Sequence, residues 1–392
     1  MPQMDVHFVL RDDDRYLTRN RNFFFIVITS KSLLKMPYRN IKFLLTIYKV
    51  LGLVPFRLTN YQLKSKSYFN RCFCTTWILV HCFCGSLDVL YLILFSDSSA
   101  KDRELSIVRS NAYFISLIPF NFVAAFHSES FVKLSYQLLT YDQQAIALGH
   151  QRKDKHTFIY LYFLYTFITL IWKCYYPIRD NISKGLLVEL MLFLTVVIPS
   201  IIGTYCVFVI CVLLDLVRQR FRHLNEKIIP QVVQLSTTGS KGEITVYDVR
   251  YLHNILLNYA YSINSIYGVG VLLTFISILM ELIWHTYSLI KDFQQDNLVI
   301  DDFVEILDLL FQTIYLFSMY HFTAYEVNRV ENLVVKHGLS FSNPKCRMDK
   351  IEMMLYFYHR RYCFTAAEFF PLDMTIFLPI STTVLTYITL II

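Results

Sequence analysis

The stretch MTIFLPISTTVLTYITLII, from Met374 to Ile392, contains no charged side chain and consists mainly of aliphatic and small hydroxyl residues. As an α-helix it would be about 28 Å long, close to the roughly 30 Å hydrocarbon thickness of a bilayer. Lipid offers no partner to exposed backbone N–H and C=O groups, so such a segment crosses a membrane as a helix. The sequence therefore predicts a transmembrane helix at its C-terminal end.

The rest of the chain has the composition of a polytopic membrane protein. Of its 392 residues, 55% are hydrophobic and only 17% are charged, and the mean hydropathy is +0.42. This apolar surface exceeds what the core of a soluble protein of the same length could bury, which argues against a soluble enzyme. The chain has 33 Phe and 28 Tyr beside 10 Gly and 10 Pro, which excludes a disordered or collagen-like protein.

Seven apolar segments are each long enough to cross a bilayer, which requires about 20 residues. An eighth apolar patch, at 41–58, carries Lys42, Lys49 and Arg57, and it predicts an amphipathic or re-entrant helix instead of a span. The predicted spans are 73–95, 107–126, 157–176, 186–214, 256–287, 303–325 and 374–392.

The distribution of Lys and Arg predicts the orientation. If the N-terminus is cytoplasmic, the inside segments hold 30 Lys and Arg and the outside loops hold 5. The positive-inside rule then favours a cytoplasmic N-terminus and an extracellular C-terminus. The predicted fold is an all-α membrane protein with seven transmembrane helices and a cytoplasmic bundle of helices. Its parts are a cytoplasmic segment at 1–72, six spans with cytoplasmic extensions and an outer ligand pocket at 73–325, a cytoplasmic helix at 326–373 and the last span at 374–392.

No motif in the sequence predicts catalysis, a metal or a cofactor. Walker, HExxH, GxSxG and CxxC patterns do not occur. Cys72, Cys74, Cys82 and Cys84 form two CxC pairs, but residues two apart point to different faces of a helix, so they do not predict a metal site. The net charge is +7, but the charged residues alternate with apolar runs and do not form a soluble basic face. A nucleic-acid partner is therefore not expected.

Ionisable and aromatic residues near the outer ends of the predicted spans suggest a small-molecule pocket. Glu281, Trp284 and His285 are spaced i, i+3 and i+4 and share one helix face. Aromatic walls with a few hydrogen-bonding groups are typical of ligand sites. The same residues also fit an aromatic belt that anchors helix ends at the membrane surface. The candidate ligand-binding residues are Trp172, Tyr176, Glu189, Glu281, Trp284, His285, Asp308 and Gln312.

Three further features of the sequence lead to predictions. Asp88 lies within the first span, so we expect it to pair with a polar neighbour and not to face lipid. Thr383, Thr386 and Leu390 form a stripe on the last span, which suits a pore with a hydrophobic gate, although Thr in membrane helices also bonds its own backbone. Asn181 belongs to the sequon Asn-Ile-Ser on the predicted outside and is a candidate for glycosylation.

The C-terminus resembles a known family. Thr386-Tyr387, followed by Ile-Thr-Leu-Ile-Ile, is similar to the TYhhhhhQF signature that closes insect gustatory receptors, where h is hydrophobic; the final Gln-Phe is missing here. Phe369–Asp373 and Leu51–Phe56 also look like recurring segments of that family. The resemblance implies a homotetrameric, non-selective, ligand-gated cation channel related to insect odorant receptors. It further implies that the last helix lines the pore and that the cytoplasmic helices anchor the tetramer.

The resemblance also implies partners and residue roles. Thr383, Thr386, Tyr387 and Leu390 would line the pore or its gate, a small tastant would bind the outer pocket, and Na⁺, K⁺ and Ca²⁺ would permeate. Sugar-sensing members usually carry an acidic residue after Thr-Tyr, whereas Ile388 stands here, which favours a bitter or plant compound as ligand. The expected location is the plasma membrane of chemosensory neurons. The alternatives are a sugar receptor, for example for fructose, an odorant-receptor-type subunit, a G-protein-coupled receptor with an outside N-terminus, and a membrane enzyme or transporter.

Overall fold

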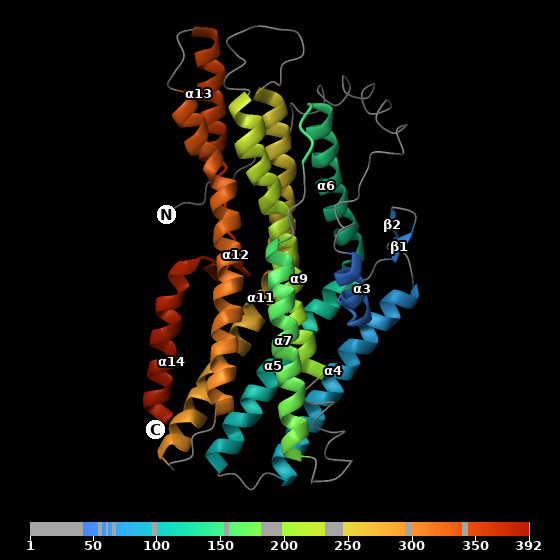
Figure 1. The fold of residues 1–392 in the computed structure, drawn as a ribbon, viewed down its shortest axis with the longest axis vertical. Coiled ribbons are helices and arrows are strands. Elements are labelled where there is room, and N and C mark those ends of the chain that lie inside the picture. The colour runs from blue at the N-terminus through green and yellow to red at the C-terminus, as the bar shows by residue number, and fades with distance from the viewer. Residues whose placement is uncertain are drawn as a thin grey trace, which may run out of the picture. The chain divides into compact units, whose positions relative to one another are not determined.

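Long helices make up most of the computed structural model (Figure 1), in which Ile41–Ile392 form one compact unit. The structure describes residues 42–53, 57–59, 62–64, 68–95, 100–152, 157–181, 198–231, 246–294, 300–338 and 344–391. Its helices are α3 (Lys42–Val50), α4 (Tyr68–Phe95), α5 (Ala100–Phe126), α6 (Ser128–Ala147), α7 (Thr157–Asn181), α9 (Ile198–His223), α11 (Val246–Gln294), α12 (Ile300–Gly338), α13 (Pro344–His359) and α14 (Phe377–Ile391).

The chain is a helical membrane protein. Among the described residues, 5 helices are long and apolar enough to cross a membrane, namely α4, α5, α9, α11 and α12. Two more helices, α7 and α14, are apolar over the shorter stretches Ile159–Lys173 and Met374–Tyr387. These seven helices lie on the seven predicted spans, except that residues 186–197 of the fourth predicted span lie outside the described residues.

The centre of the bundle is formed by α9 and α11. The apolar run of α9 from Tyr205 to Leu214 is buried on all sides, as expected for a helix that is hydrophobic around its whole circumference. α9 packs against α5, α7, α11 and α12, and α11 also packs against α5, α6 and α14. α4 and α5 run antiparallel and form a pair. This arrangement brings residues of five helices together in the interior of the bundle.

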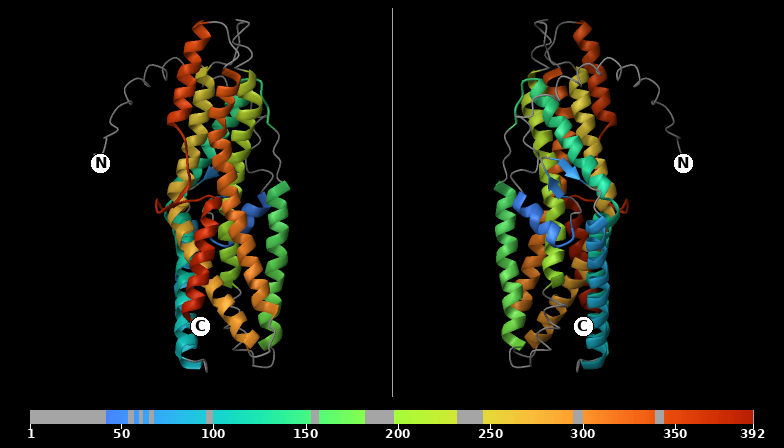
Figure 2. Two further views of the ribbon diagram at one scale, coloured as in Figure 1. Left: turned by 90° about the vertical axis from the view of Figure 1, so that its left-hand side faces the viewer. Right: turned by 90° about the vertical axis from the view of Figure 1, so that its right-hand side faces the viewer.

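Several helices are longer than a membrane requires. α11 has 49 residues and α12 has 39, whereas about 20 residues span the hydrocarbon. Their extra turns gather with α13, α6 and the end of α9 at one end of the bundle (Figures 1 and 2), called here the α13 end. The opposite end, where α4 ends and α5 begins, is called the α4–α5 end, and the chain terminates near it.

α6 lies between the second and third predicted spans, 107–126 and 157–176. Leu134, Leu138, Tyr141 and Ala145 recur every three or four residues and are all buried. This spacing is typical of an amphipathic helix and could have predicted α6 from the sequence. It is a weaker signal than the long apolar run of a membrane span, because polar residues occupy the other faces of the helix.

A short β-hairpin connects α13 to the last helix. β3 (Thr365–Ala366) pairs with β4 (Phe370–Pro371), and a 3-10 turn, η6 (Met374–Ile376), leads into α14. Asn264 on α11 accepts a hydrogen bond from the Thr365 backbone N–H at 3.0 Å and donates one to its hydroxyl at 3.2 Å. The hairpin is therefore held against the middle of α11. α13 ends at His359, six residues before β3 begins.

Tyr362 fixes the segment just before this hairpin. Its hydroxyl donates a hydrogen bond to the Ala260 carbonyl at 3.1 Å, and its backbone N–H and C=O bond to the side-chain amide of Asn328. Burial raises the pKa of the Tyr362 hydroxyl above its usual range, so the group stays protonated and remains a donor. These bonds tie the connection between α13 and α14 to both α11 and α12.

Gly52 terminates α3 at a site that excludes a side chain. Its φ is +70°, and the Leu53 N–H bonds back to the Tyr48 carbonyl at 2.9 Å, which is the pattern of a left-handed helix cap. A Cβ at Gly52 would lie 2.4 Å from Cδ1 of Trp77 on α4. This close approach explains why a glycine stands between Leu51 and Leu53.

We expect Gly52→Ala to lower the free energy of unfolding by about 2–4 kcal/mol, because the backbone conformation and the clash with Trp77 both penalise alanine. Thermal unfolding in detergent, followed by tryptophan fluorescence, measures the change. Gly149→Ala is the matched control, since Gly149 also has a positive φ of +84° but nothing within 4 Å of its Cβ position. Equal destabilisation by the two variants would show that contact with Trp77 contributes nothing.

Candidate functional site

A cavity lies between five helices in the half of the bundle toward the α4–α5 end. The empty space, its open mouth included, is about 490 Å³, of which about 60 Å³ is open to the centre of a water molecule. The lining residues are Tyr113, Ser116 and Leu117 of α5, Lys173 of α7, Ser200, Gly203, Thr204, Cys206 and Val207 of α9, Thr274, Ser277, Ile278 and Glu281 of α11, and Leu309 and Gln312 of α12.

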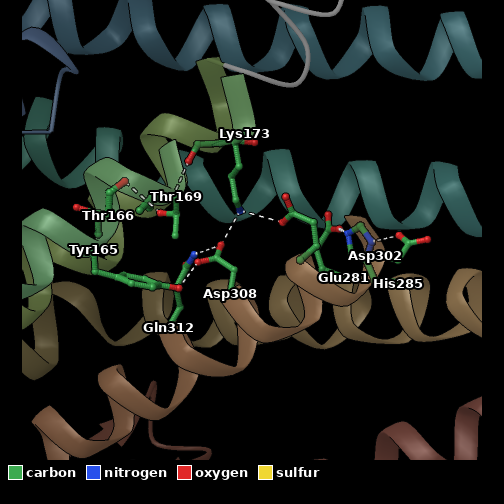
Figure 3. Close-up of polar contacts among 12 residues, drawn as sticks. Tyr165, Thr166, Thr169, Lys173, Glu281, His285, Asp302, Asp308 and Gln312 are labelled. Carbon is green, nitrogen blue, oxygen red and sulfur yellow. Dashed lines mark hydrogen bonds and ion pairs between the residues drawn. The ribbon is translucent and has the colours of Figure 1, made fainter. Parts of the chain in front are cut away.

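Lys173 forms the centre of a tightly bonded group on one side of the cavity (Figure 3). Its Nζ lies 2.8 Å from Asp308 Oδ2 and 3.1 Å from Glu305 Oε2. Gln312 Nε2 donates to Asp308 Oδ2 at 2.8 Å, and the Tyr165 hydroxyl donates to Asp308 Oδ1. Asp308 is only 5% exposed, so these contacts compensate the loss of water around its charge. The group joins α7 to α12.

Glu281 lies on another wall of the cavity and has looser contacts. Its Oε2 is 3.9 Å from Arg109 Nη1 and 3.4 Å from His285 Nε2, while His285 Nδ1 lies 2.6 Å from Asp302 Oδ1 (Figure 3). The Arg109 guanidinium lies over the Trp284 ring, with Cζ 4.8 Å from its centroid. These contacts join α5, α11 and α12 near their ends.

The structure places the predicted ligand-binding residues in three groups. Glu281 and Gln312 line the cavity. Three others do not line it but contact residues nearby: Asp308 accepts a hydrogen bond from Gln312, and His285 pairs with Glu281. Trp284 stacks with Arg109, which pairs with Glu281. Trp172 is 39% exposed on α7 and is not one of the lining residues.

Three predicted residues cannot be placed in this way. Glu189 lies outside the described residues, as do the side chains of Tyr176 and Asn181, whose backbones belong to α7. Their proposed roles in ligand binding and glycosylation therefore stay predictions.

The sequence-based set of candidates omitted the two bases of the site, Arg109 and Lys173. Arg109 lies within the predicted span 107–126 and Lys173 within 157–176. They are the Lys and Arg residues that belong to neither the inside segments nor the outside loops. A basic residue inside a span is as costly as an acidic one, so the position of these two residues could have marked them as candidates for a functional site. The Asp88 prediction is confirmed, because the Ser110 hydroxyl donates to Asp88 Oδ2 at 2.5 Å.

α14 contacts the helices of the cavity through one of its faces. Val384 packs against an apolar cluster of Ile278, Leu282 and Leu309, and two of these residues, Ile278 and Leu309, also line the cavity. One layer of side chains therefore separates the cavity from α14.

The predicted gate residues lie mainly on the uncovered part of the same helix. Leu390 is 74% exposed and Tyr387 is 52% exposed. Thr386 is also exposed, and its hydroxyl donates to the Thr382 carbonyl at 2.7 Å, which is the backbone bonding that the sequence left open as an alternative. Thr383 is half-buried.

The fold and the cavity define a helical membrane protein with a cavity between its helices. Residues 41–392 match the family model described as 7tm Chemosensory receptor, and the chain belongs to this family. The resemblance to the insect chemoreceptors is thereby confirmed. The family is one of receptors and not of enzymes.

Solved structures show the same fold. The chain is similar to the insect olfactory receptor OR5 from Machilis hrabei, with 12% sequence identity, a TM-score of 0.67, and coverage of 91% of this chain and 99% of that chain. The structure of the same receptor in complex with eugenol matches with the same values. No curated protein sequence matches the chain.

Proposed function

We propose that the protein is a gustatory receptor that works as a ligand-gated cation channel: a small molecule fills the cavity and favours an open arrangement of α14. The observation that carries the proposal is the cluster shared by the cavity and α14. A ligand that displaces Ile278 or Leu309 also displaces the surface on which Val384 rests. Packed side chains have few alternative arrangements, so a small shift at the cavity moves the helix beside it.

The exposed face of α14 supports an assembly in which this helix lines a pore. Exposed apolar residues on a helix of a membrane protein face lipid or another subunit. In a homotetramer, four copies of Leu390 would form a hydrophobic ring that excludes water when closed and admits Na⁺, K⁺ and Ca²⁺ when open. The ligand acts by binding the open arrangement better than the closed one.

The proposed ligand is a bitter or plant-derived small molecule. The absence of an acidic residue at Ile388 favours this class over sugars, and the eugenol bound to the olfactory receptor OR5 supports an organic molecule of similar size. An odorant-receptor-type subunit is the second candidate, favoured by the structural similarity to OR5. The receptor would reside in the plasma membrane of chemosensory neurons, with its N-terminus in the cytoplasm.

Leu390→Ala tests the proposed gate. We expect the basal cation current to rise on the order of tenfold, since a loss of about 1.4 kcal/mol of closed-state packing changes the equilibrium by that factor. Whole-cell currents, normalised to surface expression, measure the effect. Leu385→Ala is the control, because Leu385 is exposed on another face of α14.

Basal and ligand-evoked currents equal to those of the wild type in Leu390→Ala would contradict a gate at this position. Epitope tags provide a separate test of orientation. A C-terminal tag accessible in intact cells, with an N-terminal tag accessible only after permeabilisation, is expected. The reverse result would favour a G-protein-coupled receptor.

A further inference from the structure

Glu281 is under-coordinated compared with the other acidic residues around the cavity. Asp302 and Asp308 each have a charged partner within 2.8 Å, at His285 and Lys173 respectively. In the described part of the chain, the nearest charged or titratable partner of Glu281 is His285, at 3.4 Å, and Arg109 is farther away at 3.9 Å. Its side chain is 18% exposed and lines the cavity. A largely buried carboxylate with only long contacts retains capacity for a hydrogen-bond donor from a ligand.

The charges around the cavity favour a cation over an anion. Three basic groups, those of Arg109, Lys173 and His285, lie among four carboxylates, so one negative charge remains in excess when His285 is protonated. Charges interact strongly in an interior of low dielectric constant, so this excess of negative charge opposes the entry of an anionic ligand. The four carboxylates are those of Glu281, Asp302, Glu305 and Asp308.

The rest of the cavity lining is partly apolar, and its other members are mainly Ser and Thr. Leu117, Val207, Ile278 and Leu309 line the cavity together with the aromatic ring of Tyr113. Such walls bind a hydrocarbon body by excluding water from it. A matching ligand has an apolar skeleton and one group that donates hydrogen bonds to Glu281.

Arg109 competes with such a ligand for Glu281. Its guanidinium is held by the stacking contact with Trp284 at 4.8 Å, which keeps it 3.9 Å from the carboxylate, beyond hydrogen-bond distance. A ligand ammonium can approach more closely than this, because nothing but the cavity surrounds it. Exchange of a long ion pair for a short charge-assisted hydrogen bond favours binding.

We propose that the cavity selects organic amines: the protonated amino group of the ligand donates to the Glu281 carboxylate in place of Arg109, and the carbon skeleton packs against Ile278 and Leu309. The proposal rests on the function proposed above only in that this cavity is the ligand site. It names the chemical class of the ligand and the residue that recognises it.

The test compares probes of one shape and different charge. These are 2-phenylethylamine, which is protonated at neutral pH, its alcohol isostere 2-phenylethanol, and phenylacetate. Binding is measured by titration calorimetry on the receptor in lipid nanodiscs, with empty nanodiscs subtracted. We expect the amine to bind with a Kd on the order of 1 mM or tighter, which is modest for a molecule of this size. The alcohol should bind about tenfold more weakly, and phenylacetate should not bind.

Two variants move the amine affinity in opposite directions. Glu281→Gln should weaken amine binding at least about tenfold and leave alcohol binding within about twofold, because the amide retains the shape but not the charge. Arg109→Gln should strengthen amine binding, because it removes the competing cation. If the Glu281–Arg109 ion pair has only a structural role, both variants should weaken the binding of both the amine and the alcohol. Glu104→Gln is the control, since Glu104 is an exposed acid of α5.

The results separate this inference from the channel proposal. A wild-type preference for the amine of less than about twofold, an unchanged preference in Glu281→Gln, or no amine binding at a concentration on the order of 1 mM would each overturn the inference. Amine binding that depends on Glu281 but evokes no current in expressing cells would support the inference and contradict the channel. Currents evoked by other compounds, together with no amine preference, would support the channel and contradict the inference.

Discussion

Replacing Lys173 with methionine should lower the free energy of unfolding by about 3–5 kcal/mol, the usual cost of removing one partner from a buried ion pair. Asp308, which is 5% exposed, would lose the charge at 2.8 Å that compensates its own, and Glu305 would lose its partner at 3.1 Å. The packing of α7 against α12 would weaken when these ion pairs are lost. The measurement is the apparent thermal midpoint in detergent at a fixed scan rate, together with the yield of monodisperse protein.

Two further variants show whether charge is the cause. Asp308→Asn in the Lys173→Met background should restore part of the lost stability, because it removes the carboxylate that has no counter-charge. Lys133→Met, at an exposed position of α6, should change stability by less than about 0.5 kcal/mol. Stability of Lys173→Met within about 1 kcal/mol of the wild type would refute the structural role of this cluster.

Arg220→Met should be comparably destabilising, by about 3 kcal/mol or more. Arg220 is fully buried in α9 and forms a bidentate pair with Asp142 of α6, at 3.1 Å and 2.5 Å. Its Nη1 also donates to the Leu216 carbonyl at 2.8 Å. The variant leaves Asp142 with Arg152 at 3.4 Å as its remaining charged partner among the described residues. We expect α6 to detach locally, which faster amide hydrogen exchange in Ser128–Ala147 would report.

Arg222 provides the matched control for this prediction. It lies two residues from Arg220, and its side chain is 65% exposed while it pairs with Glu226 at 2.9 Å. Exposed ion pairs contribute about 0–1 kcal/mol, so Arg222→Met should be nearly neutral. Equal effects of the two methionine variants would show that burial of Arg220 does not matter.

The spans could be predicted from the sequence because their cause is local. A run of about 20 apolar residues must form a helix in lipid, since every backbone hydrogen bond has to be made within the segment. For this reason α4, α5, α11 and α12 fall on predicted segments without any knowledge of their neighbours. The terminal Thr386-Tyr387 pattern was likewise local, and it pointed to the chemoreceptor family that the match over residues 41–392 shows.

The helices outside the spans were harder to predict. α6 has no long apolar run, and its stability depends on packing Leu138 and Tyr141 against other helices. The β3–β4 hairpin depends on Asn264, which is 101 residues away from Thr365 in the chain. Contacts at such separations follow from which helices lie side by side, and periodicity carries no information about that.

The sequence by itself determined that this is a helical membrane protein and where most of its helices lie, and it offered a pocket shared by Glu281 and Gln312 as one of two interpretations. Only the tertiary structure decided that Lys173 of α7 pairs with Asp308 of α12 and that Ile278 and Leu309 separate the cavity from α14. The reason is physical: a helix in lipid is specified by its own residues, whereas an ion pair or a cavity requires side chains from helices whose order in space no single segment encodes.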